Sequence, residues 1–172
     1  MEMIEIANKS RASQNKKELA ILLALVKQID PKVIVEIGVH QGYSMQTWKQ
    51  AFPEAQVIGI ENDTHAIDRE ATKDCYIIEA DSHETDTQYS LLGNLRGNKI
   101  DFLFIDGDHS YDGVKRDWQL YVPLVSSGIV ALHDIAVVNN EHVQVYKFWQ
   151  EVKKNSQTVD IVIENGTGVI YL

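Results

Sequence analysis

Two groups of acidic and imidazole side chains follow predicted strands in the second half of the sequence. Asp106 opens the run DGDH at 106–109, and His133-Asp134 ends the next apolar run. If these runs are neighbouring parallel strands, Asp106 and Asp134 end side by side, and two aligned carboxylates repel unless they share a proton or a cation. Carboxylate oxygens favour Mg²⁺, Ca²⁺ or Mn²⁺, whereas an imidazole ligand shifts the preference toward Mn²⁺, Fe²⁺ or Zn²⁺. We therefore predict a functional cluster of Asp106, His109, His133 and Asp134.

A structural interpretation of the same residues stays open. Asp108 and Ser110 are typical residues for capping the helix that follows. His133 could be a buried histidine that only makes hydrogen bonds within the protein.

A glycine-containing turn follows the first apolar run. The sequence EIGVHQGYS extends from Glu36 to Ser44, directly after a predicted strand and at the start of a predicted helix. Gly38 and Gly42 allow backbone amides to approach a ligand closely, and the helix start supplies N–H donors. The spacing differs from the G-x-G-x-x-G dinucleotide pattern, and by itself it fits an ordinary tight turn equally well.

Polar residues also follow the second and third apolar runs. Glu61, with Asn62 after it, ends the second run, where a carboxylate can accept the hydroxyl protons of a ribose. Asp81-Ser82 follows the third run and could hydrogen-bond the edge of an adenine ring. The alternatives are a solvated carboxylate at Glu61 and a helix cap at Asp81-Ser82.

Short apolar runs rich in Val and Ile alternate with longer amphipathic segments. Their apolar residues are contiguous, as in strands covered by helices on both faces. These runs are 33–37, 57–61, 76–80, 100–106 and 128–134. Apolar residues at helical spacing predict helices over 16–29, 111–122 and 142–153, the first with Asn15 and Glu18 as a capping pair. The alternation predicts a doubly wound α/β fold with a parallel sheet.

The C-terminal segment departs from this alternation. Residues 160–164 and 168–172 resemble two strands, and Asn165-Gly166 lies between them. Asn-Gly between apolar runs is a strong hairpin signal. We predict a tight turn here and an antiparallel last strand.

The histidines all lie on one side of the predicted sheet. Each follows the carboxyl end of a predicted strand, where parallel sheets bind ligands. They are His40, His65, His83, His109, His133 and His142. Chance is the alternative explanation, because loops are polar in any case. An edge rich in acids and histidines favours a cationic ligand or a divalent metal.

Length and composition narrow the class of protein. The chain has 172 residues, 44% of them hydrophobic, which fits one domain over 1–172 with an N-terminal arm at 1–14. The formal charge of −9 disfavours nucleic-acid or anionic-membrane binding. Cys75 is the only cysteine, which excludes an intramolecular disulfide and thiolate-clustered zinc. Without a signal-like or membrane-length apolar run, we expect a cytoplasmic protein.

These motifs together resemble the class I S-adenosylmethionine-dependent methyltransferases. The similarity extends from about Gln14 to Leu172, and the group with a D-G-D-H-x-Y signature resembles the chain most through DGDHSY and the later LHD. The resemblance implies a Rossmann-like, seven-stranded, mostly parallel sheet with an antiparallel last strand between two others. It also implies S-adenosylmethionine as the cofactor and O-methylation of a small molecule or sugar as the activity.

The resemblance also assigns roles to individual residues. Glu36, Gly38, Gly42 and Ser44 match the turn around the methionine part of the cofactor. Glu61, beside Asn62, matches the ribose-binding carboxylate, and Asp81 with Ser82 matches the adenine-contacting loop. Asp106 matches the acid that borders methyl transfer, and in metal-dependent relatives it holds a divalent ion, usually Mg²⁺, with two residues ending the fifth strand. Here those two are His133 and Asp134, which departs from the usual Asp-Asp or Asp-Asn, so Mn²⁺ is an alternative to Mg²⁺.

The reaction requires one proton to leave the acceptor hydroxyl. His109 could take it as a general base, or a metal at Asp106 and Asp134 could lower the hydroxyl pKa. Since the sequence ends at the last strand, we expect residues 1–14, the 135–142 loop or a second subunit to cover the acceptor, and hence a homo-oligomer. Two other functions stay open: a metal-dependent hydrolase using Asp106, His109, His133 and Asp134, and a non-catalytic nucleoside-binding module.

Overall fold

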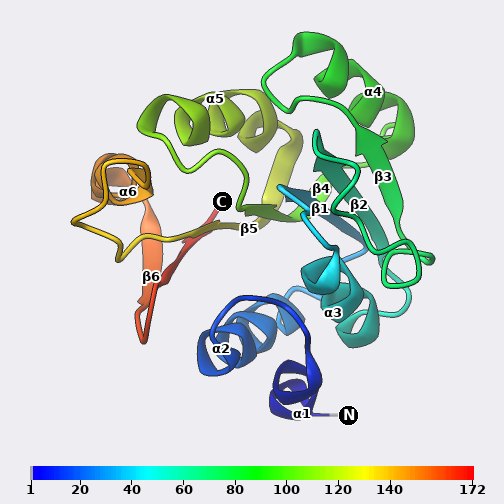
Figure 1. The fold of residues 1–172 in the computed structure, drawn as a ribbon, viewed down its shortest axis with the longest axis horizontal. Helices are drawn as coiled ribbons and strands as arrows, with labels where there is room; N and C mark the ends of the chain where they lie inside the picture. The colour runs from blue at the N-terminus through cyan, green and yellow to red at the C-terminus, as the bar shows by residue number, and fades with distance from the viewer. Residues whose placement is uncertain (1) are drawn as a thin grey trace.

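A seven-stranded sheet forms the centre of the protein (Figure 1). The structure, a computed structural model, describes residues 2–172. The strands lie in the order β3-β2-β1-β4-β5-β7-β6, and only β7 runs antiparallel to its neighbours, β5 and β6. Their bounds are β1 Val33–Ile37, β2 Gln56–Glu61, β3 Tyr76–Glu79, β4 Ile100–Ile105, β5 Val125–His133, β6 Gln157–Ile161 and β7 Thr167–Tyr171. The predicted doubly wound, Rossmann-like sheet with an antiparallel last strand is confirmed.

Helices cover both faces of this sheet. In Figure 1, α1 (Met3–Lys9), α2 (Lys16–Lys27) and α3 (Tyr43–Ala51) lie on one face. The other face carries α4 (Thr85–Leu95), α5 (Tyr111–Tyr121) and α6 (Val145–Val152). Two short 3₁₀ helices, η1 (Val122–Leu124) and η2 (Lys153–Asn155), follow α5 and α6. No helix within the described part of the chain is long and apolar enough to cross a membrane.

Alternate residues of the central strands pack into two separate apolar layers. Val35 of β1 belongs to the apolar layer that also contains residues of α4, α5 and α6, among them Trp149. Its neighbour Ile34 belongs to the layer that contains residues of α1, α2 and α3, among them Trp48. Because successive side chains of a strand point to opposite faces, both faces need apolar residues. This is why the strands are contiguous apolar runs in the sequence.

The strand register brings the predicted site residues to one edge. Ile37 of β1 pairs with Ile60 of β2 and with Ile105 of β4. Ile105 pairs in turn with Leu132 of β5. The residues that follow each of these strands therefore emerge together beyond the carboxyl ends of β1, β2, β4 and β5.

The predicted capping pair of α2 is half correct. Asn15 does cap the helix, since its side-chain oxygen accepts hydrogen bonds from the amides of Lys17 (2.9 Å) and Glu18 (3.3 Å). Glu18 does not complete a capping box. Its carboxylate is buried and instead binds the C-terminal hairpin, which is distant in the sequence.

The hairpin between β6 and β7 has a longer turn than predicted. The turn occupies 162–166, so the expected tight Asn-Gly turn is wrong. Glu18 Oε1 accepts hydrogen bonds from the amides of Ile163 (2.7 Å), Glu164 (2.7 Å) and Gly166 (3.2 Å). A buried carboxylate needs such donors, so the turn is wrapped around Glu18 rather than closed on itself.

Candidate functional site

Two adjoining cavities open at the carboxyl edge of the sheet. The first has a volume of about 460 Å³ and lies over the ends of β1, β2, β3 and β4. The second, of about 330 Å³, lies between the end of β1, the start of α3 and the segment before α2. Gly38, His40, Asp106 and His109 line both cavities. The two spaces therefore meet at the residues that follow β1 and β4.

Gly38 allows the turn after β1 to lie close to the turn after β4 at this junction. Its φ is 85°, in the left-handed region that favours glycine. A Cβ on Gly38 would lie 2.2 Å from the backbone oxygen of Asp106. Gly42, with φ 82°, similarly forms the N-cap of α3. Positive φ angles and close contacts with neighbouring atoms thus explain why glycine stands at both positions.

Glu36 lies beneath the turn rather than in a cavity. The residue is 1% exposed, and its carboxyl group accepts hydrogen bonds from the Ser44 hydroxyl and from Trp48 Nε1 (2.6 Å). Burial raises the pKa of Glu36 to about 8, against the effect of these two donors. Ser44 and Gly42 line the second cavity, whereas Glu36 lines neither. Glu36 therefore ties α3 to β1 from below.

Glu61 lines the first cavity and also organises the turn after β1. One of its carboxylate oxygens accepts the amides of Val39 (2.9 Å) and His40 (2.6 Å). The other accepts the amide of Asp63 (2.8 Å) and has a further lone pair. Asn62 lines the same cavity. The carboxylate is thus fixed at the position where the sequence predicted it.

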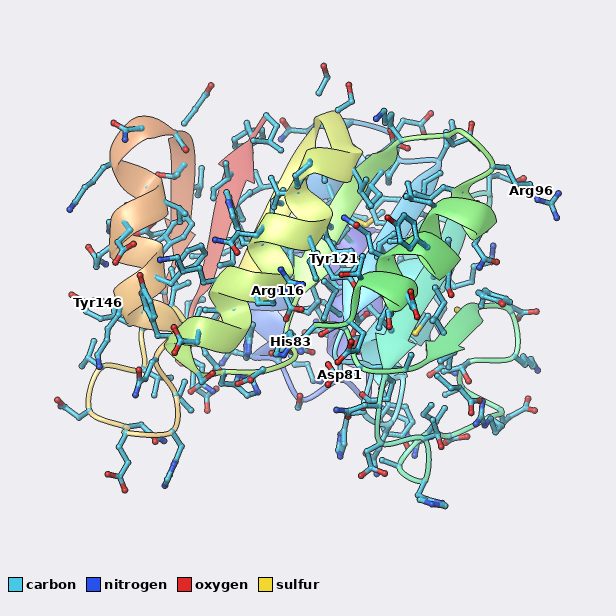
Figure 2. All side chains as sticks on the ribbon, turned by 90° about the horizontal axis from the view of Figure 1, so that it is seen from above. Asp81, His83, Arg96, Arg116, Tyr121 and Tyr146 are labelled. Carbon is cyan, nitrogen blue, oxygen red and sulfur yellow. The ribbon has the colours of Figure 1, made fainter. Side chains whose placement is uncertain are left out.

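Asp81 and Ser82 line the first cavity from the turn after β3. The sheet order puts β3 beside β2, so this turn neighbours Glu61 as predicted. Asp81 Oδ1 accepts the amide of His83 at 2.9 Å. Figure 2 shows Asp81 and His83 close together at one end of α4 and α5, whereas Arg96 lies at the opposite end of α4.

The acids and histidines after β4 and β5 form one cluster of side chains at ion-pair distance from one another. His133 Nδ1 is 3.2 Å from Asp106 Oδ1 and 3.2 Å from Asp134 Oδ1. His109 Nδ1 is 2.8 Å from Asp134 Oδ2. Asp134 has φ 64°, an unusual conformation for a residue other than glycine. The predicted juxtaposition of all four side chains is confirmed by these distances.

The cluster shifts the protonation of its own members. Burial alone would lower the pKa of His133, but hydrogen bonds to Asp106 and Asp134 outweigh it and raise that pKa to about 10. The hydrogen bond to Asp134 raises the pKa of His109. Burial opposes ionisation of Asp134, yet its hydrogen bonds with His109 and His133 lower the pKa of this carboxyl. Near neutral pH, His133 is thus a buried imidazolium between two carboxylates.

The same side chains fit a divalent cation. Asp106, His133 and Asp134 each offer one ligand atom, and these atoms lie within 4.8 Å of one another. A cation held there would replace the proton that His133 shares with the two carboxylates. Two carboxylate oxygens and one imidazole nitrogen suit Mn²⁺, Fe²⁺ or Zn²⁺ at least as well as Mg²⁺.

The segment before α2 contributes residues that the motifs did not identify. Arg11 and Gln14 line the second cavity. Gln14 is 6% exposed, and its Nε2 donates to Asp106 Oδ2 at 2.7 Å. The Arg11 guanidinium stacks 3.8 Å from the centre of the Tyr43 ring. The 1–14 arm was one expected cover for the acceptor, but no local pattern distinguished Gln14.

Comparison with known proteins agrees with this architecture. The profile of the family described as "Methyltransferase domain" matches residues 35–135. A rhamnosyl O-methyltransferase from Mycobacterium bovis is 27% identical over 112 residues, which cover 60% of this chain and 45% of that protein. The chain spans less than half the length of the curated relatives that it matches.

Two solved structures show the same fold. An O-methyltransferase from Bacillus cereus in complex with S-adenosylhomocysteine (SAH) superposes with a TM-score of 0.70 at 15% identity, covering 99% of this chain and 89% of that one. MycE, a methyltransferase of the mycinamycin biosynthetic pathway in complex with Mg, SAH and mycinamycin VI, gives a TM-score of 0.71 at 14% identity. That match covers 99% of this chain and 54% of MycE.

Proposed function

The chain belongs to the methyltransferase-domain family, and from this premise we propose that it is an S-adenosylmethionine-dependent O-methyltransferase acting on a small hydroxylated acceptor such as a sugar. The observation that carries the proposal is the meeting of two cavities at Asp106 and His109. Methyl transfer needs such a junction, because the acceptor oxygen must lie in line with the S–CH₃ bond of the cofactor. The finer assignment to the D-G-D-H-x-Y group is part of the same proposal.

The first cavity suits the nucleoside part of the cofactor. Glu61 would accept hydrogen bonds from the ribose hydroxyls, and Asn62 would lie beside the ribose. Asp81 with Ser82 would contact the adenine. The methionine part would reach the Gly38 turn, where Gly42 and Ser44 line the second cavity. The acids around the junction favour the cationic sulfonium over its neutral product. Glu36 would support this turn from beneath.

His109 is the proposed general base. Its Nδ1 lies 2.8 Å from Asp134, which leaves Nε2 to take the acceptor proton. Asp134 fixes the orientation of the ring and stabilises the imidazolium that forms. Asp106 borders the junction and is itself held by Gln14. These residues bind, orient and receive a proton, while the methyl group comes already activated on sulfur.

Asp106, His133 and Asp134 would hold a divalent cation, Mg²⁺ or Mn²⁺. When bound, the cation would lower the pKa of the acceptor hydroxyl. Titration with Mn²⁺ followed by electron paramagnetic resonance tests this part directly. Binding that disappears in Asp134→Asn supports the metal, and a wild-type protein that leaves all Mn²⁺ free rejects it.

The second cavity supports a polyhydroxylated acceptor. Its lining includes Arg11, Gln14, His40, Tyr43 and Asn165, which offer hydrogen-bond donors and acceptors rather than an apolar slot. The rhamnosyl O-methyltransferase relative is consistent with a sugar at this position. Specificity within one fold depends on such lining residues, so the acceptor is a separate part of the proposal.

The partners of the protein are also proposed. The charge of −9 disfavours a nucleic-acid or anionic-membrane partner. We propose a cytoplasmic enzyme with a small-molecule acceptor. The β6 edge of the sheet exposes Val159, and the following turn exposes Val162 and Ile163, which supports a homo-oligomer. Sedimentation analysis should give a mass above 19.5 kDa, and a monomer at high concentration would reject the oligomer.

Calorimetric titration with SAH tests the proposed function. We expect saturable binding to the wild type, and binding that is lost in Glu61→Ala. Methyl transfer from S-adenosylmethionine to a panel of sugars, read by mass spectrometry, tests the acceptor class. No heat with SAH, combined with metal-dependent phosphate-ester cleavage that Glu61→Ala retains, would favour the hydrolase instead.

A further inference from the structure

The turn between β6 and β7 forms part of the wall of the second cavity. Asn165 of this turn lines the cavity together with His109 and Asp134. His133 of β5 pairs with Thr167 of β7, so the residues just before Thr167 lie beside those just after His133. The turn is therefore placed next to the proposed general base and next to the carboxylate that orients it.

The backbone of Asn165 is fixed on this side of the turn. The amide of Ala136 donates to the Asn165 carbonyl oxygen at 2.8 Å, and the amide of Ile135 donates to the Gly166 carbonyl oxygen at 3.3 Å. Gly166 has φ 82°, and a Cβ there would lie 3.0 Å from side-chain atoms of both Ile135 and Ala136. Glycine thus permits the turn to pack closely against the segment that follows Asp134.

Helix α2 holds the same turn from another side (Figure 1). The carboxylate of Glu18 is buried, and its Oε1 accepts the amides of Ile163, Glu164 and Gly166. Its Oε2 is also buried and has no hydrogen-bond partner among residues 2–172. Asn15 Nδ2 donates to Glu164 Oε2 at 3.0 Å. A buried carboxylate with one unpaired oxygen is costly, so the turn is held in place at the expense of some stability.

This anchoring changes the position of the Asn-Gly pair. In a two-residue hairpin, Asn165 and Gly166 would form the tip between the two strands. Here Ile161 pairs with Thr167, and the turn occupies the residues between them. Asn165 is exposed and lines the second cavity. The wider turn therefore presents a carboxamide to the cavity instead of leaving it at a hairpin tip.

A carboxamide has a property that the neighbouring acids lack. Ionised carboxylates such as Asp106 and Asp134 only accept hydrogen bonds. The side chain of asparagine both donates and accepts without carrying a charge, which matches a neutral hydroxyl in either direction. The hydroxyl that is methylated must face His109 and the methyl group of the cofactor. Asn165 is therefore available for a second hydroxyl of the acceptor, one that is still present in the product.

We propose that Asn165 determines specificity for the acceptor by binding a second hydroxyl of a polyol, and that Glu18 is the residue that positions it. The proposal rests on the proposed function, because the second cavity holds the acceptor only if the first holds the nucleoside. Glu18 lines neither cavity and acts through the backbone of the turn. Alcohols with a single hydroxyl should therefore be poor acceptors.

The test uses methyl pyranosides of the gluco, manno, galacto and 6-deoxymanno series, together with their monodeoxy derivatives. Mass spectrometry of the methylated products gives KM and kcat, and calorimetry with SAH reports on the cofactor site separately. We expect Asn165→Ala to raise the KM of the best pyranoside about tenfold, with kcat and the Kd of SAH within about twofold of the wild type. One monodeoxy derivative should have the same KM with both proteins, because it already lacks the contact.

Glu18→Gln tests the positioning role. Glutamine keeps one acceptor oxygen but adds N–H donors where the buried Oε2 lies, so the turn should shift. The KM of the same pyranoside should rise about fivefold while the Kd of SAH is kept. When Asn165 is already alanine, Glu18→Gln should raise KM no further, whereas a general loss of structure would act equally in both backgrounds.

Control variants separate these effects from general ones. Asn155→Ala removes an exposed asparagine outside both cavities, and Glu54→Gln changes an exposed glutamate. Both should keep the wild-type KM and the wild-type Kd of SAH. Thermal unfolding by circular dichroism identifies a variant that does not fold. If Glu18→Gln does not fold, Gly166→Ala replaces it, because this change strains the turn on the side of Ile135 and Ala136.

The outcomes distinguish the proposals from one another. If the wild type methylates a pyranoside and Asn165→Ala has a KM within twofold of it, the role of Asn165 is overturned and the methyltransferase proposal stands. The same holds if every monodeoxy derivative keeps the tenfold difference. Additive effects of Glu18→Gln and Asn165→Ala would overturn the role of Glu18.

Two results with the wild type reach further. Protein that binds SAH but methylates no pyranoside, or methylates single-hydroxyl alcohols equally well, would overturn the polyol acceptor and the role of Asn165 while leaving the cofactor assignment intact. Protein that does not bind SAH would overturn the proposed function itself.

Discussion

Replacing Glu36 by glutamine should stabilise the protein, and more so as the pH rises. In the folded protein the pKa of Glu36 is raised from 4.5 to about 8, chiefly by burial. The folded state therefore retains a proton that the unfolded chain releases above pH 4.5. This favourable contribution is complete below pH 4.5 and is lost as the pH rises toward 8. At ~1.36 kcal/mol per pKa unit, the loss amounts to about 5 kcal/mol above pH 8.

The glutamine side chain of the Glu36→Gln variant can keep the contacts of the carboxyl group. Its amide oxygen can accept from Trp48 Nε1, and its amide nitrogen can donate to the Ser44 hydroxyl, which also accepts hydrogen bonds. The variant is therefore expected to lack the pH-dependent loss without gaining a new unpaired group. Since Glu36 lines neither cavity, the affinity of the variant for SAH should stay within about threefold of the wild type.

Urea unfolding at pH 6, 7, 8 and 9 measures the effect. The free energy of unfolding of Glu36→Gln minus that of the wild type should grow by roughly 3 kcal/mol over this range. Glu54→Gln is the matched control, because Glu54 is exposed and should show no such trend. A difference that stays flat, or a variant less stable at every pH, would refute the reasoning. It would mean that the donors Ser44 and Trp48 hold Glu36 ionised.

Three further predictions concern the turn, the base and the buried acid. Gly38→Ala should lower the free energy of unfolding by roughly 2–4 kcal/mol and abolish SAH binding, because the new Cβ would lie 2.2 Å from the Asp106 backbone oxygen. Chemical unfolding measures the first effect and calorimetry the second. A variant that is stable and binds SAH would contradict the argument. His109→Gln should reduce kcat at least ~100-fold while SAH affinity is kept, and the wild-type rate should rise with pH through the raised pKa of His109; unchanged kcat would exclude it as the base. Burial raises the pKa of Asp117 from 3.8 to about 6, so the folded state loses stability as the pH rises between these values. At pH 7.5 the free energy of unfolding of Asp117→Asn should therefore exceed that of the wild type by about 3 kcal/mol. Equal stability of the two proteins in urea would show that the acid is well paired.

The fold could be predicted from local sequence because the apolar pattern of each strand reflects which of its faces are buried. Runs such as VIVEI at 33–37 are apolar at every position but one, and both faces of the corresponding strand are indeed covered. The sequence signal was weaker at element ends. The helix expected over 142–153 begins at Val145, because the spacing of apolar residues does not mark the residue at which a helix starts.

Contacts between distant parts of the chain lay beyond the local pattern. Glu18 has the spacing of a capping residue, yet its carboxylate binds amides at 163–166. Gln14 has no motif, yet it donates to Asp106. Asp117 resembles an ordinary polar residue of an amphipathic helix, and only packing against the β3 turn buries it beside His83. Each role depends on a partner that is remote in the sequence, which no helical or strand periodicity encodes.

The sequence by itself determined which residue types stand at strand ends, and hence that carboxylates, imidazoles and glycines gather at one edge of a parallel sheet. That inference needs only strand direction, since parallel strands bring all their carboxyl ends together. Tertiary structure decided what each group does there: Glu36 lies beneath the turn and His133 lies between two carboxylates. Within residues 2–172, the buried carboxylate of Asp117 has no hydrogen-bond partner and lies 3.6 Å from His83. The reason is physical, because burial and the distance to a partner set the charge of an ionisable group, and both arise only when the chain has folded.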